Sequence, residues 1–403
     1  VKHTMPRICT VATCNLNQWA MDFEGNLARI EASIRQAKDR GARYRVGPEL
    51  EVCGYGCEDH FLEDDTFTHS WECLAQILSG DLTNGMVCDV GMPVLHAGVR
   101  YNCRVICLNR RVVAIRPKMC LANDGNYRET RYFAAWREAR GVETHRLPRA
   151  LADLAGGEAT APFGHVVLQF ADTCLGFESC EELFTPLAPH IQLALNGVEI
   201  VANGSGSHHQ LRKLNQRMEL IQSATRKAGG VYLYANQRGC DGSRLYFDGC
   251  SCVMLNGELV QTASQFALGE VEVAVASVDL DDVTLYRGGV ASMQQQMSEA
   301  ARLPSVHVAF ALTHDPALAS RPDPAIEVKY HLPEEEIAFG PAAWLWDYLR
   351  RSGASGFLLP LSGGADSAAT AAIVGAMCQM AVRAVHAGDE QVIADVRRIA
   401  GYE

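Results

Sequence analysis

The sequence predicts a layered α/β fold, followed by the beginning of a second α/β unit. Ile8 to Leu16 is rich in β-branched residues, and Asn26 to Arg40 repeats apolar residues at helical spacing before a further strand begins at Tyr44. Among the later strands predicted, which include 231–235, the segment 270–278 has alternating faces, which is typical of sheets covered by helices on one side. A strand–helix–strand opening with many later strands favours stacked layers.

The composition indicates a folded protein with about two or three domains. Of the 403 residues, 48% are hydrophobic, which is enough for a sizeable core. The net charge of -11 argues against a protein that binds nucleic acid by neutralising phosphates. We see no long uncharged apolar run and therefore expect no membrane span. Residues 1–7 lack the apolar core of a signal peptide.

The chain contains 15 cysteines, a high count for its length. Without a secretion signal they are typical of reduced thiols in a cytoplasmic protein rather than of a disulfide framework. The pairs Cys53/Cys57, Cys103/Cys107 and Cys250/Cys252 lack the two-residue gap of a zinc ribbon. We therefore predict a cytoplasmic protein without a metal site of its own.

The first half contains further expected elements after the opening unit. We predict a helix at 67–78, a strand at 87–94, a hairpin formed by strands 101–108 and 112–116, and a loop over 147–163. Further along, we predict a strand at 166–170, helices at 191–196 and 211–228, and strands at 200–203 and 250–255.

The composition changes after residue 312. The proline-rich stretch 313–333 is typical of a linker, and a helix is expected at 342–351. A short apolar strand at 357–361 and a helix at 368–381 enclose the sequence Ser362-Gly363-Gly364-Ala365-Asp366-Ser367. Only about forty residues follow, which is too few to complete an α/β domain.

Three residues at strand ends form the first chemical constellation: Glu49, Lys118 and Cys180. A thiol attacks a carboxamide only while it loses its proton, so it needs a nearby base, which a carboxylate can be. A lysine lowers the thiol pKa and stabilises an oxyanion. Each residue alone has a plainer interpretation: a surface turn, a solvated strand end and a packed thiol.

The glycine-rich loop at 362–367 is the second constellation. Its glycines let backbone amides approach a phosphate, and the helix that follows offers its positive end. The spacing is not that of a Walker loop. A simple glycine turn before a buried helix is the alternative.

Several phrases of the sequence resemble known families. Those at 47–55, 116–118 and 180–182 resemble the Glu–Lys–Cys signatures of the nitrilase superfamily. Those at 15–19, 121–129 and 203–209 look like the amidase half of the eukaryotic-type glutamine-dependent NAD+ synthetase family. The resemblance runs from about residue 5 to the end of the chain.

The resemblance implies a fold and its boundaries. Residues 5–305 would form a nitrilase-type four-layer αββα sandwich that acts as a glutaminase domain. Residues 306–333 would be a linker, and 334–403 the truncated start of a Rossmann-like ATP-pyrophosphatase domain.

The resemblance also implies roles for the glutaminase residues. Cys180 would be the nucleophile that forms a glutamyl thioester, Glu49 the general base and Lys118 the oxyanion stabiliser, with Glu129 supporting the lysine. Tyr127, Ser207 and Lys213 would bind glutamine. Ser207 could instead belong to a simple turn, and Arg212 could take the role given to Lys213.

The second half would bind the nucleotide, again by resemblance. ATP, with Mg2+ shared among its phosphates, would lie on the segment formed by Pro360, Leu361, Ser362, Gly363, Gly364, Ala365, Asp366 and Ser367. The glutaminase domain would need no cofactor.

The implied function is glutamine-dependent NAD+ synthesis. Ammonia from glutamine would amidate nicotinic acid adenine dinucleotide after ATP activates its carboxyl group, and this chain would retain the glutaminase half only. We expect a homo-oligomer. Two alternatives stay open: a stand-alone carbon–nitrogen hydrolase (amidase), and a non-catalytic truncated product that only assembles with full-length subunits.

Overall fold

The computed structural model describes residues 6–154, 157, 160–242, 244–315 and 321–401. The strands follow one another in the order β16 (Ser305–His307), β8 (Val167–Gln169), β9 (Cys174–Ser179), β10 (Ile200–Ser205), β11 (Val231–Cys240), β1 (Ile8–Leu16), β2 (Tyr44–Val46), β3 (Val87–His96), β4 (Val99–Leu108), β5 (Arg111–Pro117), β7 (Thr160–Gly164) and β6 (Val142–Arg146). β1 and β11 pair at two positions only, Asn15–Asn236 and Leu16–Gln237, which are the last two residues of β1 and two interior residues of β11. The two halves of the path therefore act as two sheets.

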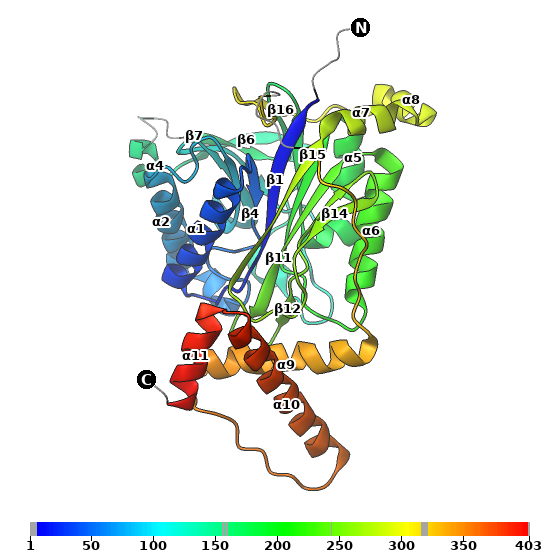
Figure 1. Cartoon of the computed structure of the whole chain (residues 1–403). Coiled ribbons are helices and arrows are strands. Elements are labelled where there is room, and N and C mark those ends of the chain that lie inside the picture. The colour runs from blue at the N-terminus through cyan, green and yellow to red at the C-terminus, as the bar shows by residue number, and fades with distance from the viewer. Residues whose placement is uncertain (1–5, 155–156, 158–159, 243, 316–320, 402–403) are drawn as a thin grey trace.

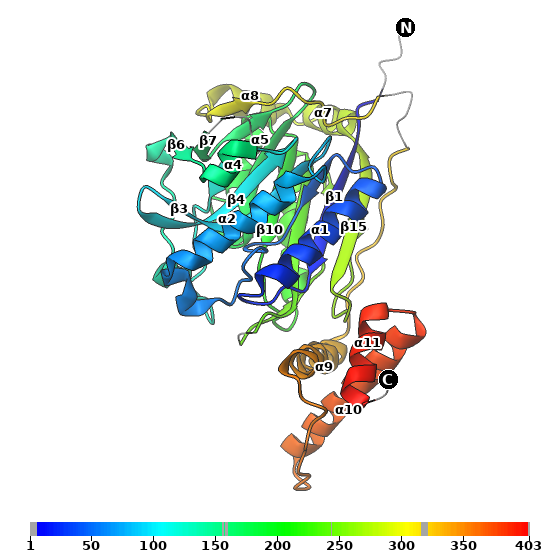
Figure 2. The same cartoon turned by 90° about the vertical axis from the view of Figure 1, so that its left-hand side faces the viewer.

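Two sheets lie between two layers of helices (Figures 1 and 2). Three apolar cores separate these four layers. The central core joins residues of both halves, such as Val46 on one and Phe177 on the other. A second core, which includes Ile30 and Leu74, lies beneath α1 and α2, and a third, which includes Met218 and Leu193, lies beneath α5 and α6. This arrangement is the αββα sandwich expected from the sequence.

The first sheet and its helices come mainly from the first 165 residues. The helical elements there are α1 (Phe23–Asp39), η1 (Glu58–Leu62), α2 (Asp64–Ser79), α3 (Glu129–Tyr132), η2 (Glu138–Arg140) and α4 (Arg149–Leu154). The strands are β1 (Ile8–Leu16), β2 (Tyr44–Val46), β3 (Val87–His96), β4 (Val99–Leu108), β5 (Arg111–Pro117), β6 (Val142–Arg146), β7 (Thr160–Gly164) and, from later in the chain, β15 (Val271–Asp279).

The second sheet is built from the middle of the chain. Its strands are β8 (Val167–Gln169), β9 (Cys174–Ser179), β10 (Ile200–Ser205), β11 (Val231–Cys240), β12 (Tyr246–Asp248), β13 (Cys252–Leu255), β14 (Glu258–Thr262) and β16 (Ser305–His307). Its helical elements are η3 (Cys180–Phe184), α5 (Pro189–Leu195), α6 (Lys213–Ala228), α7 (Leu280–Gly288) and α8 (Ala291–Glu299).

The local sequence explains these elements where the prediction was close. In α1, Leu27, Ile30 and Ile34 recur at helical spacing on the buried face, and the Asp22 carboxylate caps the first turn by accepting from the Gly25 amide. The hairpin of β4 and β5 turns at Asn109 and Arg110, whose φ angles of 49° and 66° fit the primed turns that such hairpins favour.

The loop predicted at 147–163 is wrong in part. The structure places β6 just before it and places α4 and β7 within it, while residues 155–156 and 158–159 lie outside the described part of the chain. β7 pairs with β6 along its length and with β5 at Ile115–Phe163. Pairing with distant strands outweighs the turn propensity of the local sequence.

Parallel pairing decides where the strand ends meet. β9, β10, β11, β1, β2 and β3 are parallel neighbours, and β5 returns to the same direction after the antiparallel β4. The carboxyl ends of these strands therefore share one edge. Glu49, Lys118 and Cys180 each follow such an end within three residues.

The C-terminal part consists of three helices below the sandwich (Figure 1): α9 (Pro333–Ser352), α10 (Ala365–His386) and α11 (Glu390–Ala400). Of the predicted linker, residues 316–320 lie outside the described part. The strand predicted at 357–361 is wrong: these residues form an irregular, largely exposed loop, and no described strand pairs with them. A strand needs a partner for its backbone groups, and the apolar sequence alone does not supply one.

We expected no long uncharged apolar run in the chain, but α10 contains a long apolar segment. By length and composition it could cross a membrane, and 11% of its most apolar window is buried. Helices of soluble proteins meet the same criterion, so this one helix is weak evidence for a span. In the structure, α10 packs between α9 and α11 through residues such as Met377 and Ala381.

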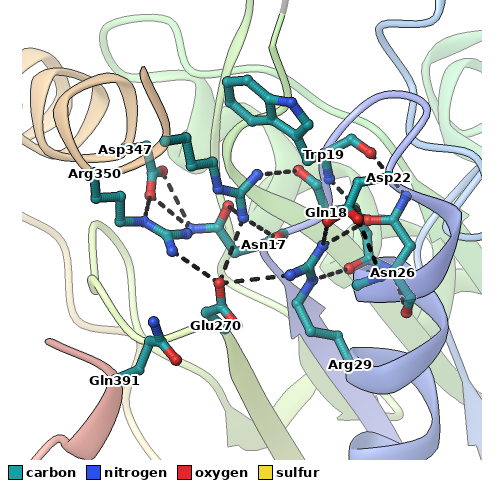
Figure 3. A network of polar contacts seen from close by, with 12 residues as sticks. Asn17, Gln18, Trp19, Asp22, Asn26, Arg29, Glu270, Asp347, Arg350 and Gln391 are labelled. Carbon is teal, nitrogen blue, oxygen red and sulfur yellow. Dashed lines mark hydrogen bonds and ion pairs between the residues drawn. The ribbon is translucent and has the colours of Figure 1, made fainter. Parts of the chain in front are cut away.

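A network of buried charges docks α9 onto the sandwich (Figure 3). The Asp347 carboxylate accepts from Asn17 Nδ2 at 3.0 Å, from the Cys240 amide at 3.0 Å and from Arg350 Nε at 2.8 Å. Arg350 also binds Glu270 at 2.8 Å. Asn17 follows β1, Cys240 is the last residue of β11 and Glu270 precedes β15, so α9 fixes strand ends of both sheets.

Replacing Asp347 by alanine should lower the free energy of unfolding of the chain by about 3 kcal/mol, because a buried arginine and two buried donors lose their acceptor. Urea denaturation of the whole chain measures this change. The matched control is Glu334→Ala, which removes an exposed carboxylate from the same helix and should cost less than about 1 kcal/mol. Equal losses in the two variants would contradict the docking role.

Candidate active site

Cys180 lies at the first position after β9, in a turn that the backbone makes sharp. Its φ angle is 40°, a left-handed value that is unfavourable for residues other than glycine. Its amide donates to Asn203 Oδ1 on the neighbouring strand β10 at 2.9 Å. The side chain is 3% exposed. The turn thus holds the thiol away from the strand axis and largely out of water.

A buried lysine joins two buried carboxylates next to this turn. Lys118 Nζ donates to Glu49 Oε1 at 2.6 Å and to Glu129 Oε1 at 2.8 Å. Tyr55 also donates to Glu129 Oε1, and the Ala122 amide donates to Glu129 Oε2 at 3.0 Å. An ammonium group has three N–H donors, so one remains for a further acceptor.

Glu49 is held by four segments of the chain. Besides Lys118, it accepts from Asn102 Nδ2 on β4 at 2.8 Å and from the Gly206 amide after β10 at 3.1 Å. Its own carbonyl accepts from Gln237 Nε2 on β11 at 2.8 Å. These bonds fix the orientation of the carboxylate, which a general base requires.

The charged groups around the thiol shift its pKa in opposite directions. Burial and the charge of Glu49 raise the pKa of Cys180, and Lys118 and Lys213 act against that rise. Burial raises the pKa of Glu129 to about 7, with Lys118 opposing the rise and Glu49 adding to it. Burial alone would lower the pKa of Lys118, but the charges of Glu129 and Glu49 raise it. At neutral pH the resting site therefore holds a neutral thiol and an ammonium group.

The predicted glutamine-binding residues gather at the same edge. Tyr127 donates its hydroxyl hydrogen to the Gly206 carbonyl at 2.8 Å and accepts from the His208 amide at 2.9 Å. Lys213 Nζ lies 5.7 Å from the centre of the Tyr127 ring. Ser207 is buried, and its amide donates to Asn236 Oδ1 at 2.9 Å.

The structure favours Lys213 over Arg212 as the cation of this site. Arg212 pairs with Glu336 of α9 at 2.9 Å and donates to the His331 carbonyl at 2.7 Å. The charge of Lys213 instead opposes the rise in the pKa of the Cys180 thiol. Burial lowers the pKa of Lys213 itself. A largely buried ammonium group near the thiol could bind a carboxylate of a substrate.

The predicted ATP-binding segment lies apart from this cluster. Residues 360–366 are exposed and connect α9 to α10. The hydrogen bonds of the loop are internal: Ser362 Oγ lies 3.1 Å from Ser367 Oγ, and Ser367 Oγ donates to the Gly364 carbonyl at 3.1 Å. Gly363 has φ 82°, so the loop needs a glycine there, and the free amides at the start of α10 suit a phosphate. No group of three or more His, Cys, Asp or Glu residues that could hold a metal ion occurs in the described ranges.

Several residues that hold the site were not among those predicted from the sequence. Asn102, Tyr55 and Asn203 contact Glu49, Glu129 and the Cys180 amide from positions 53, 74 and 23 residues away in the chain. Tyr55 and Asn203 lie within phrases that carried the resemblance, which was a usable signal. Asn102 lies inside a strand with nothing in its neighbourhood to mark it.

Comparison with known families agrees with this fold. The sequence profile of the carbon–nitrogen hydrolase family matches residues 10–288, and that of the NAD synthase family matches residues 341–396. The first match covers more than half of the chain. The chain therefore belongs to the carbon–nitrogen hydrolase family.

Individual relatives extend the similarity beyond the sandwich. A glutamine-dependent NAD(+) synthetase of Arabidopsis thaliana is 57% identical over 98% of this chain and 54% of its own length. The crystal structure of a glutamine-dependent NAD(+) synthetase from Cytophaga hutchinsonii matches with 25% identity and a TM-score of 0.75, over 98% of this chain and 56% of that one. The Acinetobacter baumannii enzyme in complex with ADP matches with 24% identity and a TM-score of 0.68, over 92% and 57%. The chain spans about half the length of the curated relatives it matches.

The raised pKa of Cys180 leads to a measurable pH dependence. Alkylation of Cys180 by iodoacetamide, followed by mass spectrometry of its peptide, should be slow at pH 7 and still rise above pH 9, because only the thiolate reacts. The exposed Cys378 in the same sample serves as the control and should react faster at neutral pH. A plateau for Cys180 below pH 8 would contradict the description of a neutral resting thiol.

Proposed function

We propose that this chain hydrolyses glutamine at Cys180 and that it is the glutaminase part of a glutamine-dependent NAD+ synthetase. The observation that carries the proposal is Lys118, buried between Glu49 and Glu129 beside the thiol. A base, a fixed positive charge and a nucleophile are the three groups that amide cleavage through a thioester requires. The similarity to glutamine-dependent NAD(+) synthetases over 98% of the chain supports glutamine as the amide.

The geometry suggests one sequence of steps. Glu49 accepts the thiol proton while Cys180 Sγ attacks the amide carbon of glutamine, and the third N–H of Lys118 donates to the developing oxyanion. The C–N bond then breaks, Glu49 returns the proton to the departing ammonia, and a glutamyl thioester remains on Cys180. Water, activated by Glu49, hydrolyses the thioester to glutamate.

Substrate binding falls to the residues around Tyr127. Burial disfavours the charged form of Lys213 and so lowers its pKa. The Lys213 ammonium group would regain stabilisation by pairing with the α-carboxylate of glutamine. Tyr127 and Ser207 would line the remainder of the site. The hydrogen bonds of Tyr127 to Gly206 and His208 keep its ring next to Lys213.

We propose the synthetase reaction only for the longer protein that the relatives represent. There, ammonia would amidate nicotinic acid adenine dinucleotide after ATP activates its carboxyl group. In this chain the segment from Pro360 to Ser367 would contact the ATP phosphates and their Mg2+. The ADP bound to the Acinetobacter baumannii relative supports a nucleotide site.

Two wider expectations accompany the proposal. None of the 15 cysteines, all of which lie in the described ranges, forms a disulfide, which suits a reducing cytoplasmic compartment. We also propose a homo-oligomer, which size-exclusion chromatography with light scattering would detect.

The purified chain should release glutamate from glutamine, and Cys180→Ala should abolish that release. Glu49→Gln should lower kcat by about 10²- to 10⁴-fold, because the thiol loses its base while the shape of the site is retained. A coupled glutamate dehydrogenase assay measures both effects. The matched control is Glu24→Gln, which changes an exposed carboxylate of α1 and should leave kcat unchanged.

Two outcomes would contradict the glutaminase proposal. Glutamate release no greater than that of Cys180→Ala would indicate a non-catalytic chain that acts only in assemblies. Equal activity on glutamine and on simple amides would indicate a general amidase.

ATP with Mg2+ should raise the melting temperature of this chain little or not at all. The predicted phosphate loop is exposed and makes hydrogen bonds only within itself, so it offers few contacts. Differential scanning fluorimetry with and without nucleotide measures the shift, and Asp366→Ala is the control for specific binding. A clear shift that Asp366→Ala removes would show that the loop binds ATP without further chain.

A further inference from the structure

A second buried glutamate, Glu182, lies two residues after the nucleophile and has no role in the steps above. Its side chain is fully buried, and both of its oxygens are in use. Oε1 accepts from the Met119 amide at 2.5 Å and from Arg116 Nη1 at 2.8 Å. Oε2 accepts from the Ser179 amide at 2.7 Å and from Arg116 Nη1 at 2.6 Å.

These partners flank the two catalytic positions. Arg116 and Met119 lie on either side of Lys118, and Ser179 directly precedes Cys180. The strands that carry them, β5 and β9, belong to opposite sheets. Along the path of paired strands they are separated by β10, β11, β1, β2, β3 and β4. Glu182 therefore connects the ends of two strands directly, although six other strands stand between them in the sheet order.

The link matters because the two sheets carry different parts of the chemistry. The position of Lys118 is set by β5, and that of Cys180 by β9 and its left-handed turn. Small shifts of one sheet against the other would change the distance from the ammonium group to the thiol. A displacement of about 1 Å can lower a rate about 10²-fold.

We infer that Glu182 is a positioning residue that fixes the Cys180 turn against the Lys118 strand end, with Arg116 holding the Glu182 carboxylate in place. The inference rests on the proposed glutamine hydrolysis. Glu182 does not touch the reacting atoms. It sets the separation of the two groups that do.

Only a carboxylate satisfies this set of partners. Both backbone amides and Arg116 are donors, so both side-chain oxygens must accept. A glutamine has one acceptor oxygen and one donor nitrogen, so it would leave either the Met119 or the Ser179 amide facing a second donor. The isosteric change Glu182→Gln therefore loosens one of the two strand ends and keeps the volume of the side chain.

The test compares Glu182→Gln with the unchanged chain in two assays. In glutamate release, kcat should fall about 10²-fold while KM changes less than about threefold, because Tyr127, Ser207 and Lys213 lie on other segments. In iodoacetamide labelling followed by peptide mass spectrometry, Cys180 should react more slowly, with its pH profile displaced to higher pH. Lys118 would then stabilise the thiolate less.

Two further variants keep the test decisive. If Glu182→Gln fails to fold because Arg116 is left as a buried unpaired charge, the double variant Arg116→Met, Glu182→Gln removes that charge and should still show the low kcat and displaced profile. Glu199→Gln is the matched control. It breaks the ion pair with Arg7 at the amino end of β10, the opposite edge of the sheet, and should leave kcat and labelling unchanged.

Two results would overturn the inference: a lower melting temperature with unchanged kcat and labelling, or an equal loss of kcat in Glu199→Gln. Either would give Glu182 a role in stability alone. If the unchanged chain releases no glutamate, the proposed function fails. The labelling profile of Cys180 then still decides whether Glu182 positions the thiol against Lys118.

Discussion

The ammonium group of Lys118, buried between the carboxylates of Glu49 and Glu129, is the interaction on which the remaining structure depends. Each of these charges would be strongly destabilised if it were buried alone. Together they are tolerated because every charge has an opposite charge within 2.8 Å and further hydrogen bonds from Asn102, Gly206 and Ala122. The backbone segments that carry these groups must therefore meet closely, which the shared edge of parallel strands makes possible.

Buried arginines stabilise the loops at that edge. Arg104 donates to the carbonyls of Gly47 and Pro48 at 2.7 and 2.8 Å, immediately before Glu49. Arg45 pairs at 2.7 Å with Glu51, two residues after Glu49. Since guanidinium groups offer several donors in a fixed plane, they can satisfy loop carbonyls that no strand pairs. The loop that carries Glu49 is irregular in conformation, and buried arginines hold it on both sides.

The sequence allowed the layered fold and the three central residues to be predicted, because both leave a local signal. β1 was predicted with the bounds it has, and Glu49, Lys118 and Cys180 each follow an apolar strand. Tyr55, Asn102 and Glu182 could not be assigned their partners, because those partners come close only after both sheets have formed. The strand expected at 357–361 is absent from the described chain because strand formation also depends on distant partners. Its sequence is suitable for a strand, but no described strand pairs with it.

The left-handed backbone of Cys180 has an energetic cost. A residue with a side chain pays a conformational penalty of about 1–2 kcal/mol at such a φ angle, and glycine would not. Leu50, the neighbour of Glu49, has a left-handed φ of 50° as well. Two of the loops that meet at this edge thus store backbone strain, and the packing around them must offset it.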